Sequence, residues 1–420
     1  MLARSPYRRA SLVVLVAMAF ISVSCSRSSQ GAQSGLTGTT SSTCPGQPLL
    51  FTAILSLTGP LAVPGLATET ENATNAALKA VNDQCALGRP VAVKECDDKS
   101  DPNVAQQCGL EAKSDGSLAL FGSSGTFTNG TSAAQLPGVF TAGGTLFDLT
   151  NPESFSSTSA LTLVVAGGSV AAGLHKTQNT FVVVDTAATR AFSSIAQEVA
   201  KSEGVKLDLL FVPADTTDYA PIAAQVMEGK PQSIGLVLPD PVPFMNALAS
   251  EGITAKSVPI LTAVTLMPPA VLHQLGSVAN GMYLLTQQAP PSDSSNPGIR
   301  QMLKELREAG FNANGNDLSP ASTAAWSNVH ALVAVLEKLP KSEIKTLTSA
   351  DVVKAMKNAG PIDRPEVAPF DFDKLAFPDI SALASFRIFS RDAMVVRVED
   401  EHYERVSSFS NATAPFKLGS

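Results

Sequence analysis

Short apolar runs alternate with helix-like segments in the first part of the chain, and this arrangement occurs four times. The apolar runs end in turns of Gly, Ser, Thr or Asp and predict buried strands at 49–55, 90–96, 117–121 and 138–141. Helices are predicted at 66–82 and at 103–113, the second opening with Asp101-Pro102. Because strands that alternate with helices form parallel sheets with right-handed crossovers, this part predicts a doubly wound sheet.

A second series of the same kind begins near residue 160. Its strands are predicted at 179–185, 207–212, 233–238, 258–264 and 281–287, and its helices at 191–202, 219–228 and 243–250. In the first of these helices, the spacing of one buried helix face is followed by Phe192, Ile195, Ala196 and Val199. Two such series in a chain of 420 residues predict two α/β lobes, each large enough to bury its own core.

The pattern changes after the second series. Apolar stripes and a capping box predict three helices, which include 299–306, 329–336 and the segment that opens with Thr348 and Asp351. Further on, 386–389 and 394–398 are predicted to pair as an antiparallel hairpin with its turn at 390–392. We expect the helices to return to the first lobe and the hairpin to close the second.

Residues 1–25 have the features of a targeting segment. Three arginines near the start precede an apolar stretch at 11–23 that is too short to span a bilayer. Cys25 follows small residues, as in bacterial lipoprotein signals, so we expect Cys25 to be lipidated; release by an ordinary signal peptidase is the alternative. Residues 26–46 are rich in Ser, Gly and Thr and predict a flexible tether.

Charge and cysteine content narrow the class of protein. The formal net charge is −7 and the basic residues form no cluster, which argues against nucleic acid and against an anionic membrane surface as partners. Membrane contact is therefore expected only through the lipid on Cys25.

The other cysteines suit disulfides in an exported protein. We favour Cys96 with Cys108, a strand end beside the following helix, and Cys44 with Cys85, although three pairings are open. The histidines are scattered, so no metal or cofactor is expected.

Two turns at the carboxyl ends of predicted strands form the candidate ligand site. They are residues 122–125 and 141–145, built mainly from Gly, Ser, Thr and Ala. Small ligands bind at this edge of an open α/β sheet, and the backbone N–H groups at helix starts attract carboxylates. We expect the N–H groups of both turns to be free. Phe127 follows the first turn and is a candidate for the wall of the cleft.

Four motifs together carry a family resemblance. They are Leu55-Ser56-Leu57-Thr58-Gly59-Pro60-Leu61, Glu95-Cys96-Asp97-Asp98-Lys99-Ser100-Asp101-Pro102, Gly122-Ser123-Ser124 and Gly143-Gly144-Thr145. In this order the chain resembles the branched-chain amino-acid binding proteins, which are type I periplasmic-binding-fold receptors of ABC importers, over residues 47–406. The resemblance implies an α/β fold of two doubly wound, Rossmann-like lobes, joined by three crossing segments near 159–165, 287–292 and 362–372. Lobe 1 would comprise 47–160 plus 290–362, and lobe 2 would comprise 161–289 plus 363–410.

The resemblance also implies where the ligand is held. Family members hold the carboxylate and amine of an amino acid with backbone and hydroxyl groups of the first lobe, and with aromatic and acidic side chains of the second. At the second-lobe places this chain has Thr189, Pro241 or Val242, and Ala263, which suits a less charged, more apolar ligand. The expected contacts in both lobes are Thr58, Ser123, Ser124, Phe127, Gly143, Gly144, Thr145, Asp185, Thr189, Asp240 and Ala263.

Three functions compete on these grounds. The leading hypothesis is a monomeric, lipid-anchored solute-binding protein, at the outer face of the cell membrane or in the periplasm, which catalyses no reaction. It would bind a small amino-acid-like, carboxylate or amide ligand by hinge closure and deliver it to an ABC permease, as in amino-acid transport. The alternative is a ligand-sensing receptor lipoprotein on the same fold. The third reading, an exported hydrolase, needs a nucleophile that is not recognisable here: residues 122–126 lack the last Gly of a nucleophile elbow.

Overall fold

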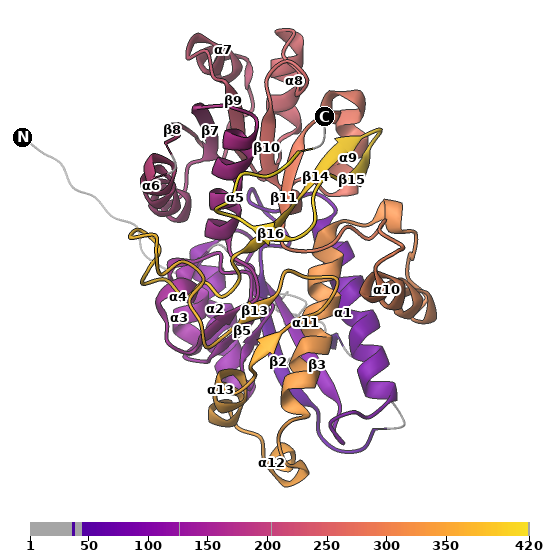
Figure 1. Ribbon diagram of the computed structural model, residues 1–420. Helices are drawn as coiled ribbons and strands as arrows, with labels where there is room; N and C mark the ends of the chain where they lie inside the picture. The colour runs from indigo at the N-terminus through magenta and orange to yellow at the C-terminus, as the bar shows by residue number, and fades with distance from the viewer. Residues whose placement is uncertain (1–35, 38–43, 126, 203, 419–420) are drawn as a thin grey trace, which may run out of the picture. The chain divides into compact units, whose positions relative to one another are not determined.

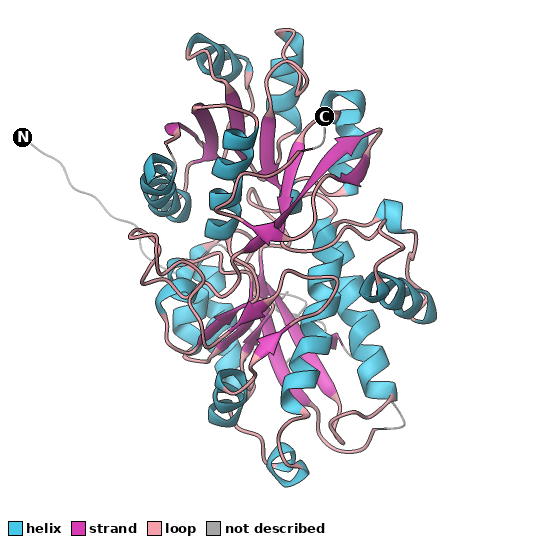
Figure 2. Cartoon of the chain, in the orientation of Figure 1, coloured by secondary structure: helices cyan, strands magenta, loops and turns pink. Residues whose placement is uncertain are grey.

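Two large sheets, each with parallel strands at its centre and helices on its faces, dominate the fold of the computed structural model (Figure 1; Figure 2). The structure describes residues 36–37, 44–125, 127–202 and 204–418. The predicted targeting segment 1–25, including Cys25, and most of the predicted tether 26–46 lie outside these residues. Within the described ranges, no helix combines the length and the apolarity needed to cross a membrane.

The first sheet has the strand order β1-β3-β2-β4-β5-β6. Its strands are β1 (Leu36–Thr37), β2 (Leu49–Leu55), β3 (Val91–Asp97), β4 (Leu120–Phe121), β5 (Gly138–Thr141) and β6 (Ser154–Ser156). All neighbouring pairs are parallel except β1 with β3. The four strands predicted for the first series are confirmed, although the third, β4, has only two residues. β6 was not predicted.

Helices cover both faces of this sheet. They are α1 (Leu66–Asp83), α2 (Pro102–Ser114), α3 (Thr128–Ala134) and α4 (Leu146–Thr150), followed much later in the chain by α10 (Pro297–Glu308), α11 (Pro320–Leu336), α12 (Lys341–Lys345) and α13 (Ser349–Lys357). α10 and α11 pack against α1, so the late helices return to the first sheet as predicted (Figure 1). Asp101 caps α2 and Thr348 with Asp351 forms the predicted capping box of α13.

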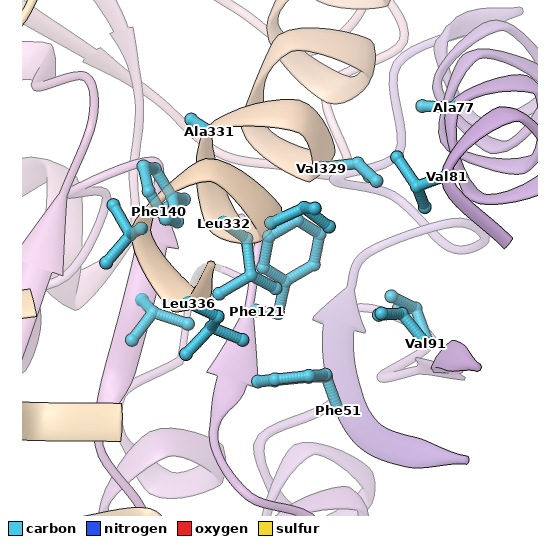
Figure 3. Packing of buried hydrophobic residues seen from close by; sticks show 14 of the residues in the cluster. Phe51, Ala77, Val81, Val91, Phe121, Phe140, Val329, Ala331, Leu332 and Leu336 are labelled. Atoms are coloured by element: carbon cyan, nitrogen blue, oxygen red, sulfur yellow. The ribbon is translucent and has the colours of Figure 1, made fainter. Parts of the chain in front are cut away.

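The larger core of the first sheet lies on the side of α1 and α11. Figure 3 shows how the side chains from alternate positions of the strands meet those of the two helices. The labelled residues are Phe51, Val91, Phe121 and Phe140 from the strands, Ala77 and Val81 from α1, and Val329, Ala331, Leu332 and Leu336 from α11. Complete burial of a Phe, Leu or Val side chain stabilises a fold by about 1.5–3 kcal/mol. Trp326, also on α11, is fully buried in this core.

The second sheet has the order β15-β14-β11-β10-β9-β7-β8, and its strands β7 to β11 run parallel. They are β7 (Gln178–Val184), β8 (Lys206–Val212), β9 (Ser233–Val237), β10 (Ile260–Ala263), β11 (Tyr283–Thr286), β14 (Asp392–Glu399) and β15 (His402–Arg405). The accompanying helices are α5 (Ala160–Gly173), α6 (Ala187–Ser202), α7 (Ala220–Glu228), α8 (Val242–Ser250) and α9 (Pro269–Leu275). The predicted strands and helices of the second series are confirmed within a few residues.

Two predicted elements are wrong. The hairpin expected from 386–389 and 394–398 does not form: β14 pairs with β11 on one side and with β15 on the other. The apolar residues at 386–389 face a core instead, since Phe389 packs edge-on against Phe372. The crossing segment expected at 159–165 is largely the start of helix α5, which Ser159 caps through the N–H of Leu161.

The chain passes between the sheets three times. It leaves the first sheet after β6, returns after β11, and leaves again between β13 (Phe370–Asp371) and β14. β13 pairs with β12 (Pro361–Ile362), and Phe370, Phe372 and Phe389 belong to the first core, so the third crossing lies later than 362–372. The bridge between Gln288 and Val367 joins the second passage to the loop between β12 and β13.

The cysteines pair as favoured from the sequence, Cys44 with Cys85 and Cys96 with Cys108. The first disulfide ties the start of the described fold to the end of α1. The second ties the end of β3 to α2. Native disulfides in exported domains typically stabilise the fold by about 2–4 kcal/mol each.

Candidate ligand-binding site

A cavity of about 500 Å³ lies between the two sheets and reaches into both of them. Cavities of about 300–1,000 Å³ are typical of small-molecule sites. On one side it is lined by residues of β2, β3, α1 and α11, and on the other side by residues of β7, β9, β10, β11, α5 and α6. The cavity therefore has a first-sheet arm, a second-sheet arm and a middle part between the sheets.

The second-sheet arm runs along β7, between this strand and the helices α5 and α6. Asn179, Phe181 and Val183 line it from alternate positions, which place their side chains on one face of the strand. At a rise of about 3.3 Å per residue, these positions span about 13 Å. Gly235 on β9 makes room for the Phe181 ring, because a Cβ there would lie 1.9 Å from Cε1 of Phe181. At the deep end, Oδ1 of Asn179 is buried without a hydrogen-bond partner among the described residues.

The first-sheet arm lies between β2 and β3 on one side and α1 and α11 on the other. The lining residues of α11 follow the spacing of one helix face and are small: Ala321, Ala324, Ala325 and Asn328. On α1, Thr70 and Thr74 recur at the same spacing. Because alanine and threonine fill less space than the leucines and valines of the neighbouring core, they leave the arm open.

The lining is mainly apolar. Its aromatic residues are Phe121, Phe140, Phe181 and Phe192, and its polar groups are hydroxyls and amides of residues such as Ser124, Thr262 and Asn328. Among the described residues that line it, Glu95 alone has an ionisable side chain. Burial, together with the nearby negative charge of Glu71, raises the pKa of Glu95 from its usual 4.5 to about 7. The cavity thus offers extensive apolar surface and one titratable carboxyl group.

The structure brings some of the predicted contacts to this cavity. Ser124, Gly144, Thr189 and Ala263 line it, two from each side. The Thr189 hydroxyl is already bound within the fold, since it donates to the carbonyl of Val184. These residues belong to the middle part of the cavity, at the carboxyl ends of the strands, where the sequence predicted the ligand.

The other predicted contacts in the first sheet do not line the cavity, and three of them have structural partners. The Ser123 hydroxyl accepts the N–H of Ile54 at 3.0 Å, and the Thr58 hydroxyl donates to the carboxylate of Asp97 at 2.6 Å. Thr145 caps α4 in a capping box with Asp148. The remaining two, Gly143 and Phe127, also lie outside the lining.

The two acids predicted near the second-sheet strand ends are engaged elsewhere. Asp185 forms a two-bond ion pair with Arg190, with N–O distances of 2.6 Å, and this pairing lowers the pKa of Asp185. Asp240 is exposed and accepts the N–H of Val242 at the start of α8. Neither acid lines the cavity.

The prediction of free N–H groups in the two turns is wrong for several of them. The N–H of Gly122 donates to Val139, and those of Ser124 and Gly125 both donate to the carbonyl of Ile54 at 3.2 and 3.1 Å. The N–H of Ala142 donates to Ser123. The reason is that β4 is only two residues long, so its neighbours extend the hydrogen bonding of the sheet into the turn. The first turn therefore has little capacity left for a carboxylate.

Sequence reasoning missed both arms of the cavity. Glu95 did carry a signal, because it shares one face of its strand with Val91 and Val93, and a lone acid on an apolar strand face is unusual. The small residues of α11 also carried one. Neither pattern shows which elements face each other across a cavity, and that information came only with the fold.

Comparison with known proteins agrees with this geometry. Residues 51–401 match the family model described as periplasmic binding protein. The chain therefore belongs to the type I periplasmic binding protein family, the solute-binding proteins of ABC transporters, as its resemblance to the branched-chain amino-acid binding proteins predicted. A search of curated proteins found no match.

Several solved structures share the fold. An extracellular ligand-binding receptor from Verminephrobacter eiseniae is 16% identical, with a TM-score of 0.70, over 85% of this chain and 99% of that one. A solute-binding protein from R. palustris in complex with 4-hydroxybenzoate is 17% identical, with a TM-score of 0.69, over 87% and 98%. A fatty acid ABC transporter substrate-binding protein from Thermomonospora curvata is 16% identical, with a TM-score of 0.68, over 92% and 96%. Identities this low show a common fold and leave the ligand of this chain open.

Proposed function

We propose that this protein is an exported, lipid-anchored solute-binding protein that captures a mainly apolar organic molecule and delivers it to an ABC permease. It binds the molecule without transforming it. The observation that carries the proposal is the cavity of about 500 Å³, lined almost wholly by apolar side chains and neutral polar groups. An amino-acid ligand would leave much of the apolar surface in both arms uncovered.

Burial of apolar surface contributes most of the binding free energy for such a ligand. At about 25 cal/mol per Å², each 100 Å² of apolar ligand surface removed from water contributes about 2.5 kcal/mol. Association costs at least about 4 kcal/mol in lost translational and rotational freedom. A ligand that extends into both arms offsets this cost better than a small one, because it covers more apolar surface. The predicted contacts Ser124, Gly144, Thr189 and Ala263 then serve to exclude water and to orient the ligand at the mouth of each arm.

Hinge closure supplies the signal to the permease. The cavity takes its walls from both sheets, so a ligand that contacts both walls stabilises the closed arrangement over an open one. The three passages between the sheets are the hinge, and the closed surface is what the permease recognises. Related structures are described as complexes with 4-hydroxybenzoate and as a fatty acid transporter's binding protein, which supports an organic ligand with a ring or a chain.

A thermal-shift screen tests this function. The purified protein, without its first 25 residues, is heated with aliphatic and aromatic amines, alcohols, amides and acids, and with leucine, isoleucine and valine. We expect apolar compounds with six or more carbons to raise the melting temperature and the three amino acids to have little effect. A shift produced by the amino acids alone would contradict the proposal.

A further inference from the structure

We propose that Glu95 determines the ligand's chemical class, and that the cavity takes an elongated apolar molecule ending in a protonated amine. The inference rests on the proposed function, because it assumes that the cavity is the binding site. It predicts a clear order of affinity for ligands of one length: the amine binds best, the alcohol less well and the carboxylate worst.

Glu95 lies on the wall of the first-sheet arm. Val91, Val93 and Glu95 alternate along β3 and share its face toward α1 and α11. The two valines are buried in the core, whereas Glu95 lines the first-sheet arm. Its register partner on β2 is Ala53, which also lines the arm and is too small to cover the carboxylate. The Glu95 carboxyl group is thus accessible from the cavity.

The Glu95 carboxylate has neither a hydrogen-bond donor nor a cation as a partner among the described residues. Among the described residues, none donates a hydrogen bond to its carboxylate, and the nearby charge, Glu71 on α1, has the same sign. No Lys, Arg or His is found among the described lining residues. In its charged form, a half-buried acid that lies beside another acid and faces an apolar space is stabilised by a cation or a hydrogen-bond donor. We infer that the ligand supplies this cation or hydrogen-bond donor.

Three backbone N–H groups of the first turn, residues 122–125, are not available to an anionic ligand. The N–H groups of Gly122, Ser124 and Gly125 are bound to backbone carbonyls, so they offer no site that would favour an anion. A carboxylate placed in the first-sheet arm would meet the charge of Glu95 in surroundings that screen it weakly. An ammonium group there would form a charge-assisted hydrogen bond, which is about twice as strong as a neutral one.

The acid–base state of Glu95 makes the preference dependent on pH. The pKa of Glu95 is raised to about 7 by burial and by Glu71, whereas an alkylamine has a pKa near that of lysine, about 10.4. Between pH 6 and pH 8 Glu95 gains its charge while the amine keeps its own. Amine affinity should therefore rise over this range, and alcohol affinity should change little.

Titration calorimetry with octylamine, octanol and octanoate tests the inference on the wild type, on Glu95→Gln and on Glu153→Gln. The last variant is the matched control, since Glu153 is exposed and does not line the cavity. At pH 8 we expect the wild type and Glu153→Gln to bind octylamine at least about tenfold more tightly than octanoate, a difference of about 1.4 kcal/mol. Glu95→Gln should lose at least about tenfold in octylamine affinity and keep its affinity for octanol.

The outcomes of this experiment distinguish the role of Glu95 from the proposed function of the cavity. If all three probes bind with similar affinity, or if Glu95→Gln binds octylamine as the wild type does, the role of Glu95 is overturned while the apolar site stands. If none of the probes binds to any variant, the proposed function fails, and the inference fails with it. Should Glu95→Gln not fold, the wild type alone decides: octylamine affinity that does not rise between pH 6 and pH 8 contradicts the inference.

Discussion

At the scale of single residues, some polar groups are hydrogen-bonded within the fold and others face the cavity. Ser123, Thr145 and Asp185 were plausible ligand contacts in the sequence, because hydroxyls and acids at strand ends often bind ligands. In the structure each is bound to a neighbour: Ser123 to Ile54, Thr145 to Asp148 and Asp185 to Arg190. Glu95 is different, because no described residue hydrogen-bonds to its carboxylate.

Glu95 makes the unliganded protein less stable as the pH rises. Its pKa is about 7 in the folded protein and about 4.5 when unfolded, so between these values the folded state holds a proton that the unfolded state has lost. The stability that Glu95 contributes is complete below pH 4.5 and is lost by pH 7. Since one pKa unit corresponds to about 1.4 kcal/mol and the cavity hydrates part of the side chain, we expect a loss of about 1–3 kcal/mol.

Glu95→Gln isolates this effect from that of Asp148, whose pKa burial raises to about 6. We expect the variant and the wild type to unfold at the same urea concentration at pH 4.5, and the variant to resist more urea at pH 8. Equal stability at both values would show that the Glu95 carboxyl group is well solvated, and it would weaken the account of the first-sheet arm.

At the scale of elements, most of the architecture could be predicted from the sequence, since strand and helix periodicities are local signals. β7 and α6 are examples, with predicted bounds close to those observed. Failures occurred where tertiary contacts decide the outcome. The apolar stretch that became α5 fits a strand or a buried helix equally well, and only its packing against α6, β11 and β14 makes it a helix. Phe389 continues a strand-like pattern but fills a core.

The small face of α11 is an element-scale feature that can be tested. Replacing Ala324 by Leu adds three carbons to the wall of the first-sheet arm. We expect Ala324→Leu to reduce octanol affinity by at least about tenfold, with little change in melting temperature because the added carbons enter an existing space. Ala220→Leu on α7, an exposed helical position, is the control and should bind as the wild type. Undiminished binding by Ala324→Leu would place the ligand elsewhere.

One side chain contacts all three passages between the sheets. The amide of Gln287 accepts the N–H of Ser159 at 2.8 Å and donates to the carbonyl of Asp392 at 3.2 Å, so it joins all three passages. Gln287→Ala leaves the buried N–H of Ser159 without this partner, which costs about 1–3 kcal/mol. We expect a lower urea midpoint than in the wild type or in Gln107→Ala, where the lost partner is exposed. An unchanged midpoint would show that water replaces Gln287.

At the scale of the whole molecule, the proposed function requires the two sheets to close on the ligand. The cavity has walls from both sheets. We expect saturating octylamine to reduce the radius of gyration measured by small-angle X-ray scattering, because the ligand bridges the two walls. Binding without any change in the radius would mean that the molecule is closed before the ligand arrives, and hinge closure would then not carry the signal.

The central claim is that the cavity holds an apolar organic molecule, and native mass spectrometry of the freshly purified protein tests it most directly. We predict a population heavier than the bare chain by one organic molecule, which is released on unfolding and is absent from Ala324→Leu. Retention of leucine, isoleucine or valine by both proteins would contradict the claim.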